Sequence, residues 1–204
     1  RMQRRLTALF DAGPARLLPR IRLVTAIDML VADALPPPPA PLARRLALAR
    51  LVEAHLAAAA GGGAMHAFEM AESLSPLIGE MGGEGVTRAD LAALDLGDLS
   101  AHWQANRAVI ELALRLAEDT APEGEARLRR AADKLAARWA AAPPAHPVIV
   151  AGSTGARAPT ARLMRAVAAL PQGALVLPGF DFGMPADAWA ALDSAGMAEE
   201  HPQC

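Results

Sequence analysis

Two short, continuous apolar runs separated by a helical stretch constrain the fold of this chain more than any other feature. The runs are Val148–Val150 and Ala174–Leu177, and such runs are typical of strands that are buried on both faces. Between them, Pro159 suits the first position of a helix that we expect to reach Leu170. A strand, a helix and a strand within roughly thirty residues predict a βαβ unit with parallel pairing and a right-handed crossover.

The middle of the chain is predicted to be helical. Proline-rich connectors at 36–41 and 143–144 bound this part, because repeated proline fixes φ and removes amide donors. Thr87 and Asp90 have the spacing of a capping box, and Ser100 is a further candidate cap. Apolar residues at helical spacing predict helices over 42–60, 65–81, 87–94, 100–114 and 123–141.

The N-terminal residues are predicted to return to the α/β part. Residues 1–10 have the pattern of a helix, and Ile21–Val24 is a candidate strand. Thr25 and Asp28 have capping-box spacing, which predicts a short helix. The expected organisation is a helical part inserted into a helix-rich α/β fold. The α/β part covers 1–35 and 147–204, and the helical part covers 42–142.

Composition excludes several classes of function. A net charge of −2 excludes a strongly basic body, so any nucleic-acid contact must come from a local stripe. A single cysteine, Cys204, cannot form a disulfide framework or a cysteine cluster, and the five histidines are scattered, so we expect no metal site. No run approaches the ~20 apolar residues of a membrane helix, and the first residues lack the pattern of a secretory signal. We therefore expect a cytoplasmic protein with no membrane partner.

Residues 151–157 form a glycine-rich turn between the predicted strand and helix. Free amides at such a turn can bind phosphate, but a P-loop needs Gly-Lys-Ser/Thr, and here Gly155 is followed by Ala156-Arg157. No acidic residue follows the strand to orient magnesium, so ATP hydrolysis is not expected. Three interpretations stay open, namely a structural turn, a nucleic-acid contact through Ser153, Thr154 and Arg157, and acyl or phosphate chemistry at Ser153.

A basic stripe lies along the helix predicted over 123–141. Its members at spacings of three and four residues are Arg127, Arg130, Lys134 and Arg138. A basic face opposite an apolar one is usually the solvated side of a helix, and the alternative is contact with a phosphate backbone or with a partner subunit.

Several segments carry a family resemblance. They are Pro147–Gly155, Pro159–Ala161, Leu170–Gly179, Trp189, His201–Gln203, Leu18–Ile21, Leu42–Leu46, Ala101–Gln104 and Ala137–Trp139. In order and spacing they resemble the alphaproteobacterial type of the AddB family of double-strand break repair proteins. The resemblance spans most of the chain and is densest over 147–181.

The resemblance implies that the chain belongs to a larger protein. AddB is one subunit of the heterodimeric AddAB helicase–nuclease, which processes broken DNA ends for recombination. Its front half resembles a superfamily-one helicase, with a RecA-like α/β domain interrupted by a helical subdomain. Its nuclease part, with magnesium and an iron–sulfur cluster held by cysteines, has no matching motif in this chain.

The expected function is a non-motor part of AddB, with DNA ends and the AddA subunit as partners. No catalytic residue, cofactor or metal is expected within these residues. The alternative is a small α/β hydrolase or transferase that uses Ser153 and Thr154. Such an enzyme needs a general base within reach of its nucleophile, and His146 is the nearest in sequence.

Overall fold

A computed structural model describes residues 2–14, 17–58, 64–93, 101–179 and 183–194 of the chain. This part of the chain is rich in helix and contains one small parallel sheet, so it has mixed α/β character. The elements are α1 (Met2–Asp11), the 3-10 helix η1 (Val24–Ala34), α2 (Pro41–Ala58), α3 (Ala64–Glu84), α4 (Arg88–Ala93), α5 (Ala101–Asp119), α6 (Gly124–Ala141), β1 (Val148–Ala151), α7 (Ala158–Ala168), β2 (Gly173–Val176) and α8 (Ala186–Ser194).

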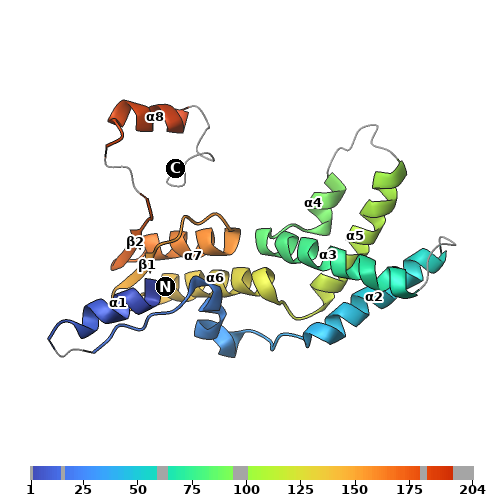
Figure 1. The fold of residues 1–204 in the computed structure, drawn as a ribbon, viewed down its shortest axis with the longest axis horizontal. Helices are drawn as coiled ribbons and strands as arrows, with labels where there is room; N and C mark the ends of the chain where they lie inside the picture. The colour runs from blue at the N-terminus through green and yellow to red at the C-terminus, as the bar shows by residue number, and fades with distance from the viewer. Residues whose placement is uncertain (1, 15–16, 59–63, 94–100, 180–182, 195–204) are drawn as a thin grey trace.

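The molecule is elongated, with two groups of elements side by side (Figure 1). Helices α2 to α5 form the first group, and their buried side chains make a helical core. This core consists of Leu48, Ala49, Val52, Ala67, Ala71, Ile78, Leu91, Val109, Ile110, Ala113 and Leu114. The predicted helices of this region are confirmed with shifted ends, and α5 continues to Asp119. The predicted cap Ser100 lies outside the described residues.

The second group, formed by η1, α6, α7 and the sheet, packs around an α/β core. Its buried residues are Ile27, Val31, Leu35, Ala131, Ala132, Leu135, Val150, Leu163, Met164 and Val167. The sequence places α6 in the helical part over 42–142. In the structure, Ala131, Ala132 and Leu135 of α6 are buried together with residues of η1, β1 and α7, so these residues of α6 form part of the α/β core.

The two strands form the predicted parallel βαβ unit. Val148 lies opposite Gly173, and Ala151 lies opposite Val176. The expectation that the strands are buried on both faces is wrong for the described chain. Val150 is buried, whereas Ile149 is 61% exposed and Val176 is 56% exposed. The sheet therefore has one covered face and one apolar face that no described element covers.

The short helix predicted at Thr25–Asp28 is confirmed as η1, whereas the strand before it and its capping box are not found. No strand forms at Ile21–Val24, and η1 begins where that strand would end. The N-cap residue of η1 is Leu23, and no side chain caps the helix. The carboxylate of Asp28 instead accepts a hydrogen bond at 2.8 Å from Nε of Arg127 on α6. A guanidinium is a stronger partner for a carboxylate than a neutral amide, so Asp28 joins η1 to α6 rather than capping η1.

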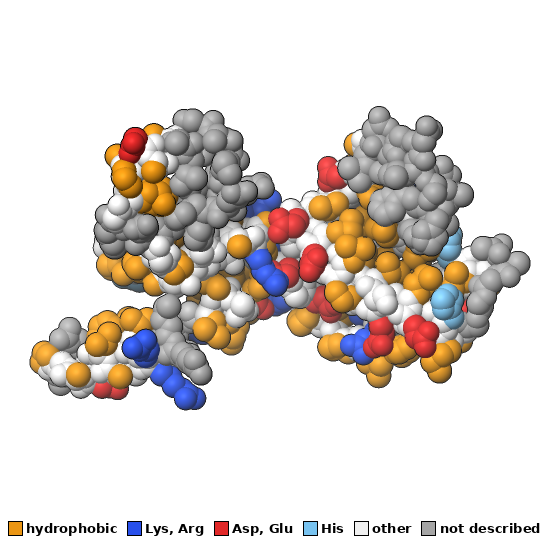
Figure 2. Space-filling view, turned by 45° about the horizontal axis from the view of Figure 1, so that its top comes forward, with side chains coloured by type: hydrophobic (Ala, Val, Ile, Leu, Met, Phe, Trp, Pro, Cys, Tyr) orange, Lys and Arg blue, Asp and Glu red, His pale blue; other side chains and the backbone are white. Residues whose placement is uncertain are grey.

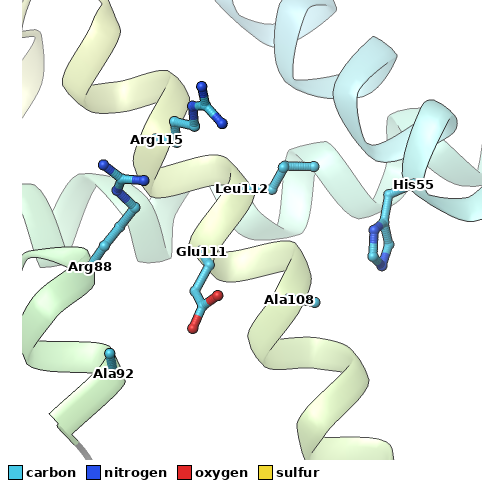
Figure 3. A pocket seen from close by; sticks show the side chains of 7 residues that line it. All are labelled: His55, Arg88, Ala92, Ala108, Glu111, Leu112 and Arg115. Carbon is cyan, nitrogen blue, oxygen red and sulfur yellow. The ribbon is translucent and has the colours of Figure 1, made fainter.

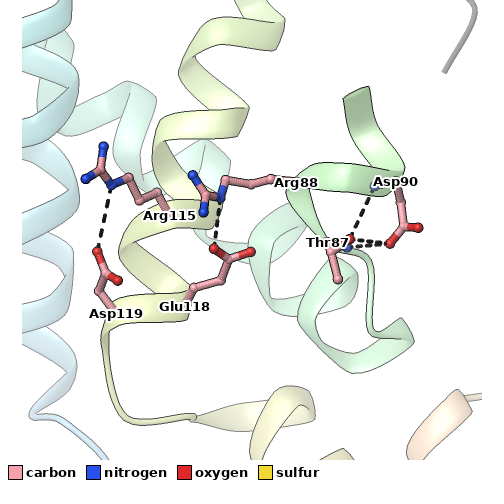
Figure 4. A network of polar contacts seen from close by, with 6 residues as sticks. All are labelled: Thr87, Arg88, Asp90, Arg115, Glu118 and Asp119. Carbon is pink, nitrogen blue, oxygen red and sulfur yellow. Dashed lines mark hydrogen bonds and ion pairs between the residues drawn. The ribbon is translucent and has the colours of Figure 1, made fainter. Parts of the chain in front are cut away.

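The predicted capping box at the start of α4 is confirmed. The backbone amide and the hydroxyl of Thr87 donate to Oδ2 of Asp90 at 2.8 and 2.7 Å, and the amide of Asp90 donates to Oγ1 of Thr87 at 3.2 Å. Figure 4 shows this pair beside the ion pairs of α4 and α5. The side-chain hydrogen bond from Thr87, followed by the backbone one, holds the pKa of Asp90 below its ordinary value of 3.8.

We expect the stabilising effect of this capping box to depend on pH. A carboxyl group whose folded pKa is lowered stabilises the fold above its unfolded pKa, and this contribution is lost as the pH falls through the folded pKa. Asp90→Asn should therefore lower the melting temperature relative to wild type at neutral pH, and the difference should vanish in strong acid. Thermal unfolding at several pH values measures it, with the exposed Glu80→Gln as control. An equal difference at all pH values would contradict this origin.

Candidate functional site

The turn between β1 and α7 is the first candidate site. Gly152 and Gly155 both have φ of +75°, which favours glycine. The amide of Gly155 donates to Oγ of Ser153 at 3.3 Å. A Cβ atom on Gly155 would lie 3.1 Å from Sδ of Met164 on α7, so the turn packs tightly onto the helix that follows it. These contacts are the features of a structural turn.

Carboxylates surround the N-terminus of α7. The amide of Ala158 donates to Oε1 of Glu84 at 3.2 Å, and Nη1 of Arg157 lies 2.6 Å from Oε1 of Glu125. Glu80 lines the same cleft of about 220 Å³ together with Gly83. Figure 2 shows acidic and basic side chains gathered here, in the middle of the molecule. Three carboxylates against one guanidinium disfavour a phosphate at this helix end.

The geometry does not assemble a nucleophile with its base. Ser153 is half-buried and Thr154 is exposed after the end of β1, whereas the exposed His146 precedes β1. A strand rises about 3.3 Å per residue, so β1 holds His146 more than about 10 Å from Ser153. The hydrolase or transferase alternative therefore lacks the general base that the sequence offered for it.

The basic stripe of α6 divides into two pairs with different surroundings. Arg127 donates to Asp28 and to the carbonyl oxygen of Pro36, and Arg138 donates to the carbonyl oxygen of Leu30 at 3.2 Å. These two arginines hold η1 and its C-terminal end. Arg130 and Lys134 are exposed, and the described residues place no ion pair or hydrogen bond on them. Within the described chain, the stripe therefore offers two free cations rather than four.

A larger groove lies between α2, α4 and α5 (Figure 3). Its volume is about 430 Å³, and it is lined by His55, Arg88, Ala92, Ala108, Glu111, Leu112 and Arg115. Sequence reasoning missed this groove, although the members on α5 share one helix face at spacings of three and four residues. The signal was not decisive, because the groove also needs residues of α2 and α4.

Two arginines that line this groove form ion pairs at its surface. Nε of Arg88 lies 2.8 Å from Glu118, and Nε of Arg115 lies 4.0 Å from Asp119, with side chains between 41 and 71% exposed. Figure 4 shows both pairs. Exposed pairs of this kind contribute little to stability. Among the described residues, no serine, threonine or cysteine lines the groove.

The part of the chain that the structure describes contains no group of three or more histidine, cysteine, aspartate or glutamate residues that could hold a metal ion. Among the described helices, none combines the length and apolar character that crossing a membrane requires. Cys204 and His201 lie outside the described residues.

Comparison of the chain with protein-family models, with curated proteins and with solved structures finds no match.

Proposed function

We propose that the chain is a non-motor part of the AddB subunit of a cytoplasmic AddAB helicase–nuclease, which processes DNA double-strand breaks for recombinational repair. In this proposal the sheet is part of a RecA-like, superfamily-one helicase-like domain, and the helices from α2 to α5 are its inserted subdomain. The resemblance over 147–181 and the parallel βαβ unit support the proposal.

The observation that carries the non-motor role is the occupied N-terminus of α7. A nucleotide-hydrolysing domain needs this helix end for phosphate, with a lysine and a magnesium-binding carboxylate nearby. Here Glu84 accepts the hydrogen bond of the Ala158 amide, and the turn contains neither a lysine nor a carboxylate. A triphosphate would meet three carboxylates and a single guanidinium, that of Arg157. The βαβ unit is therefore suited to supporting other parts of the complex.

The open face of the sheet supports a role within a larger assembly. Parallel sheets normally have both faces covered, and here Ile149 and Val176 present apolar side chains that no described element covers. In the proposed complex, further parts of AddB or the AddA subunit cover this face.

DNA contact in this proposal comes from the free cations Arg130 and Lys134. Contact through Ser153, Thr154 and Arg157 stays a prediction, and the neighbouring carboxylates disfavour it. Arg127 and Arg138 hold η1, so they are less available to a phosphate backbone.

We expect Lys134→Ala to weaken binding of the purified chain to a blunt-ended DNA duplex. Each phosphate contact contributes close to one unit to the slope of log affinity against log salt concentration, so the slope should fall in magnitude by about 1. Fluorescence anisotropy at several salt concentrations measures it. Arg50→Ala is the matched control, because it removes an equal charge from an exposed position on α2.

Two results would contradict the proposal. Equal slopes for Lys134→Ala and wild type would exclude Lys134 from the DNA contact. Magnesium-dependent ATP turnover by the purified wild-type chain would exclude the non-motor role.

A further inference from the structure

The helical core and the α/β core meet where the C-terminal end of α3 crosses α6 and reaches α7 (Figure 1). Polar contacts cross this junction at several points. Nε of Arg129 on α6 donates to the carbonyl oxygen of Gly82 on α3 at 2.9 Å. Arg44 on α2 and Glu123, which precedes α6, form an ion pair at 2.6 Å with side chains only 16 and 30% exposed.

The crossing of α3 and α6 depends on two glycines. A Cβ atom on Gly83 would lie 2.7 Å from Cβ of Glu125, and one on Gly82 would lie 3.0 Å from Cβ of Ala126. The distance between packed helices is set by the side chains at their contact, so hydrogen in place of a side chain lets these backbones touch. A Cβ atom on Gly79, one turn earlier on α3, would meet no atom within 4 Å. Close contact is therefore local to residues 82–83.

The end of α3 places an acidic side chain against the second core. Gly85, with φ of +84°, ends the helix, and the amides of Gly85 and Val86 both donate to the carbonyl oxygen of Met81 at 2.9 and 2.8 Å. This left-handed ending turns the chain away. Glu84, the last helical residue, then extends to the N-terminus of α7 and accepts the hydrogen bond of Ala158. A carboxylate at a helix N-terminus is favoured by the helix dipole.

We propose that this junction holds the helical core and the α/β core at one fixed angle. Gly82 and Gly83 set the angle between the two cores through their close contact with α6. The hydrogen bond that Glu84 accepts from the Ala158 amide restrains this angle at the first turn of α7. Because Ala158 directly follows the turn between β1 and α7, its hydrogen bond to Glu84 also makes the position of that turn depend on the position of the helical core.

The fixed angle is tested by measuring a distance between the two cores in the full chain. Spin labels are placed at exposed helix positions through Ala54→Cys on α2 and Ala168→Cys on α7, with Cys204→Ser to remove the native thiol. Double electron–electron resonance should give one narrow distance distribution for this background. Gly83→Ala should shift its mean, because the new methyl group overlaps Glu125. Gly79→Ala on the same helix should leave it unchanged.

The role of Glu84 is tested by removing its carboxylate without introducing a steric clash. Glu84→Ala should broaden the distance distribution, because the close contact at Gly82 and Gly83 remains while the hydrogen bond to Ala158 is lost. Glu80→Ala is the matched control, since Glu80 lines the same cleft and no described residue forms an ion pair with it. This arm keeps the proposal testable if circular dichroism shows that Gly83→Ala does not fold.

Three outcomes would overturn the proposal. The first is a broad or double distribution in the labelled background, which would mean that the cores are not held at one angle. The second is an equal effect of Gly83→Ala and Gly79→Ala. The third is a distribution for Glu84→Ala that matches the distribution for Glu80→Ala.

Discussion

Gly173→Ala is expected to unfold the α/β core, or nearly so. Gly173 is the first residue of β2, directly after the turn that follows α7, and its amide donates to the carbonyl oxygen of Leu170 at 3.1 Å. A Cβ atom at this position would overlap the carbonyl oxygen of Val167 and lie 2.8 Å from the carbonyl carbon of Val167. The obstacle is backbone rather than the end of a flexible side chain, so either β2 or the end of α7 must move.

The expected cost is large because both elements are anchored. Val167 is fully buried in the α/β core, and β2 is paired with β1 along its length. Overpacking against a side chain typically costs about 1 to 3 kcal/mol, and a clash with backbone should cost at least about 3 kcal/mol. That is a large part of the ~5 to 15 kcal/mol by which ordinary domains are stable.

Urea unfolding followed by circular dichroism measures this loss of stability. Gly79→Ala is the matched control, because position 79 lies inside α3 and a methyl group there meets no atom within 4 Å besides the neighbouring backbone of its own helix. That control should be stabilised by about 0.5 to 1 kcal/mol, since alanine is the better helix former. A Gly173→Ala variant within about 1 kcal/mol of wild type would show that β2 does not lie against α7 as described.

Leu135→Ala should be the next most destabilising change. Leu135 lies on α6, its side chain is 2% exposed, and it packs in the α/β core. Truncating a fully buried leucine removes transfer free energy and leaves a cavity, which together cost about 2 to 5 kcal/mol. Amide hydrogen exchange should show the loss first in α6, α7 and β1, because these elements surround the cavity.

The neighbouring Lys134→Ala is the control for this change, because Lys134 is exposed on the same helix. It should alter stability by no more than about 0.5 kcal/mol. If Leu135→Ala reduced protection in α2 and α5 as much as in α6 and α7, the loss of stability would not be local to the α/β core.

Local patterns in the sequence predicted most of the helices and the βαβ unit. The capping box of Thr87 and Asp90 is one example, because both partners lie within one helical turn and need no other part of the chain. The same spacing at Thr25 and Asp28 lies within a helix, η1, as predicted, but it forms no capping box. There the carboxylate binds Arg127, which is 99 residues away in sequence. Spacing alone does not distinguish these two cases.

The candidate site shows the same division. The sequence predicted the turn at 151–157, because a turn of this kind follows from adjacent residues. It did not predict that Glu84, 74 residues before Ala158, would accept the hydrogen bond of that amide. The electrostatic character of the turn therefore depends on helices that the turn's own residues do not specify.

By itself, the sequence determined the elements that depend on contacts within a few residues, since helical periodicity, caps and apolar runs act over one or two turns. Long-range packing places buried residues of α6 in the α/β core, leaves one sheet face open among the described elements, and brings carboxylates to the N-terminus of α7. The reason is physical: each of these outcomes depends on which distant groups packing brings within hydrogen-bond or van der Waals distance, and no local pattern encodes that distance.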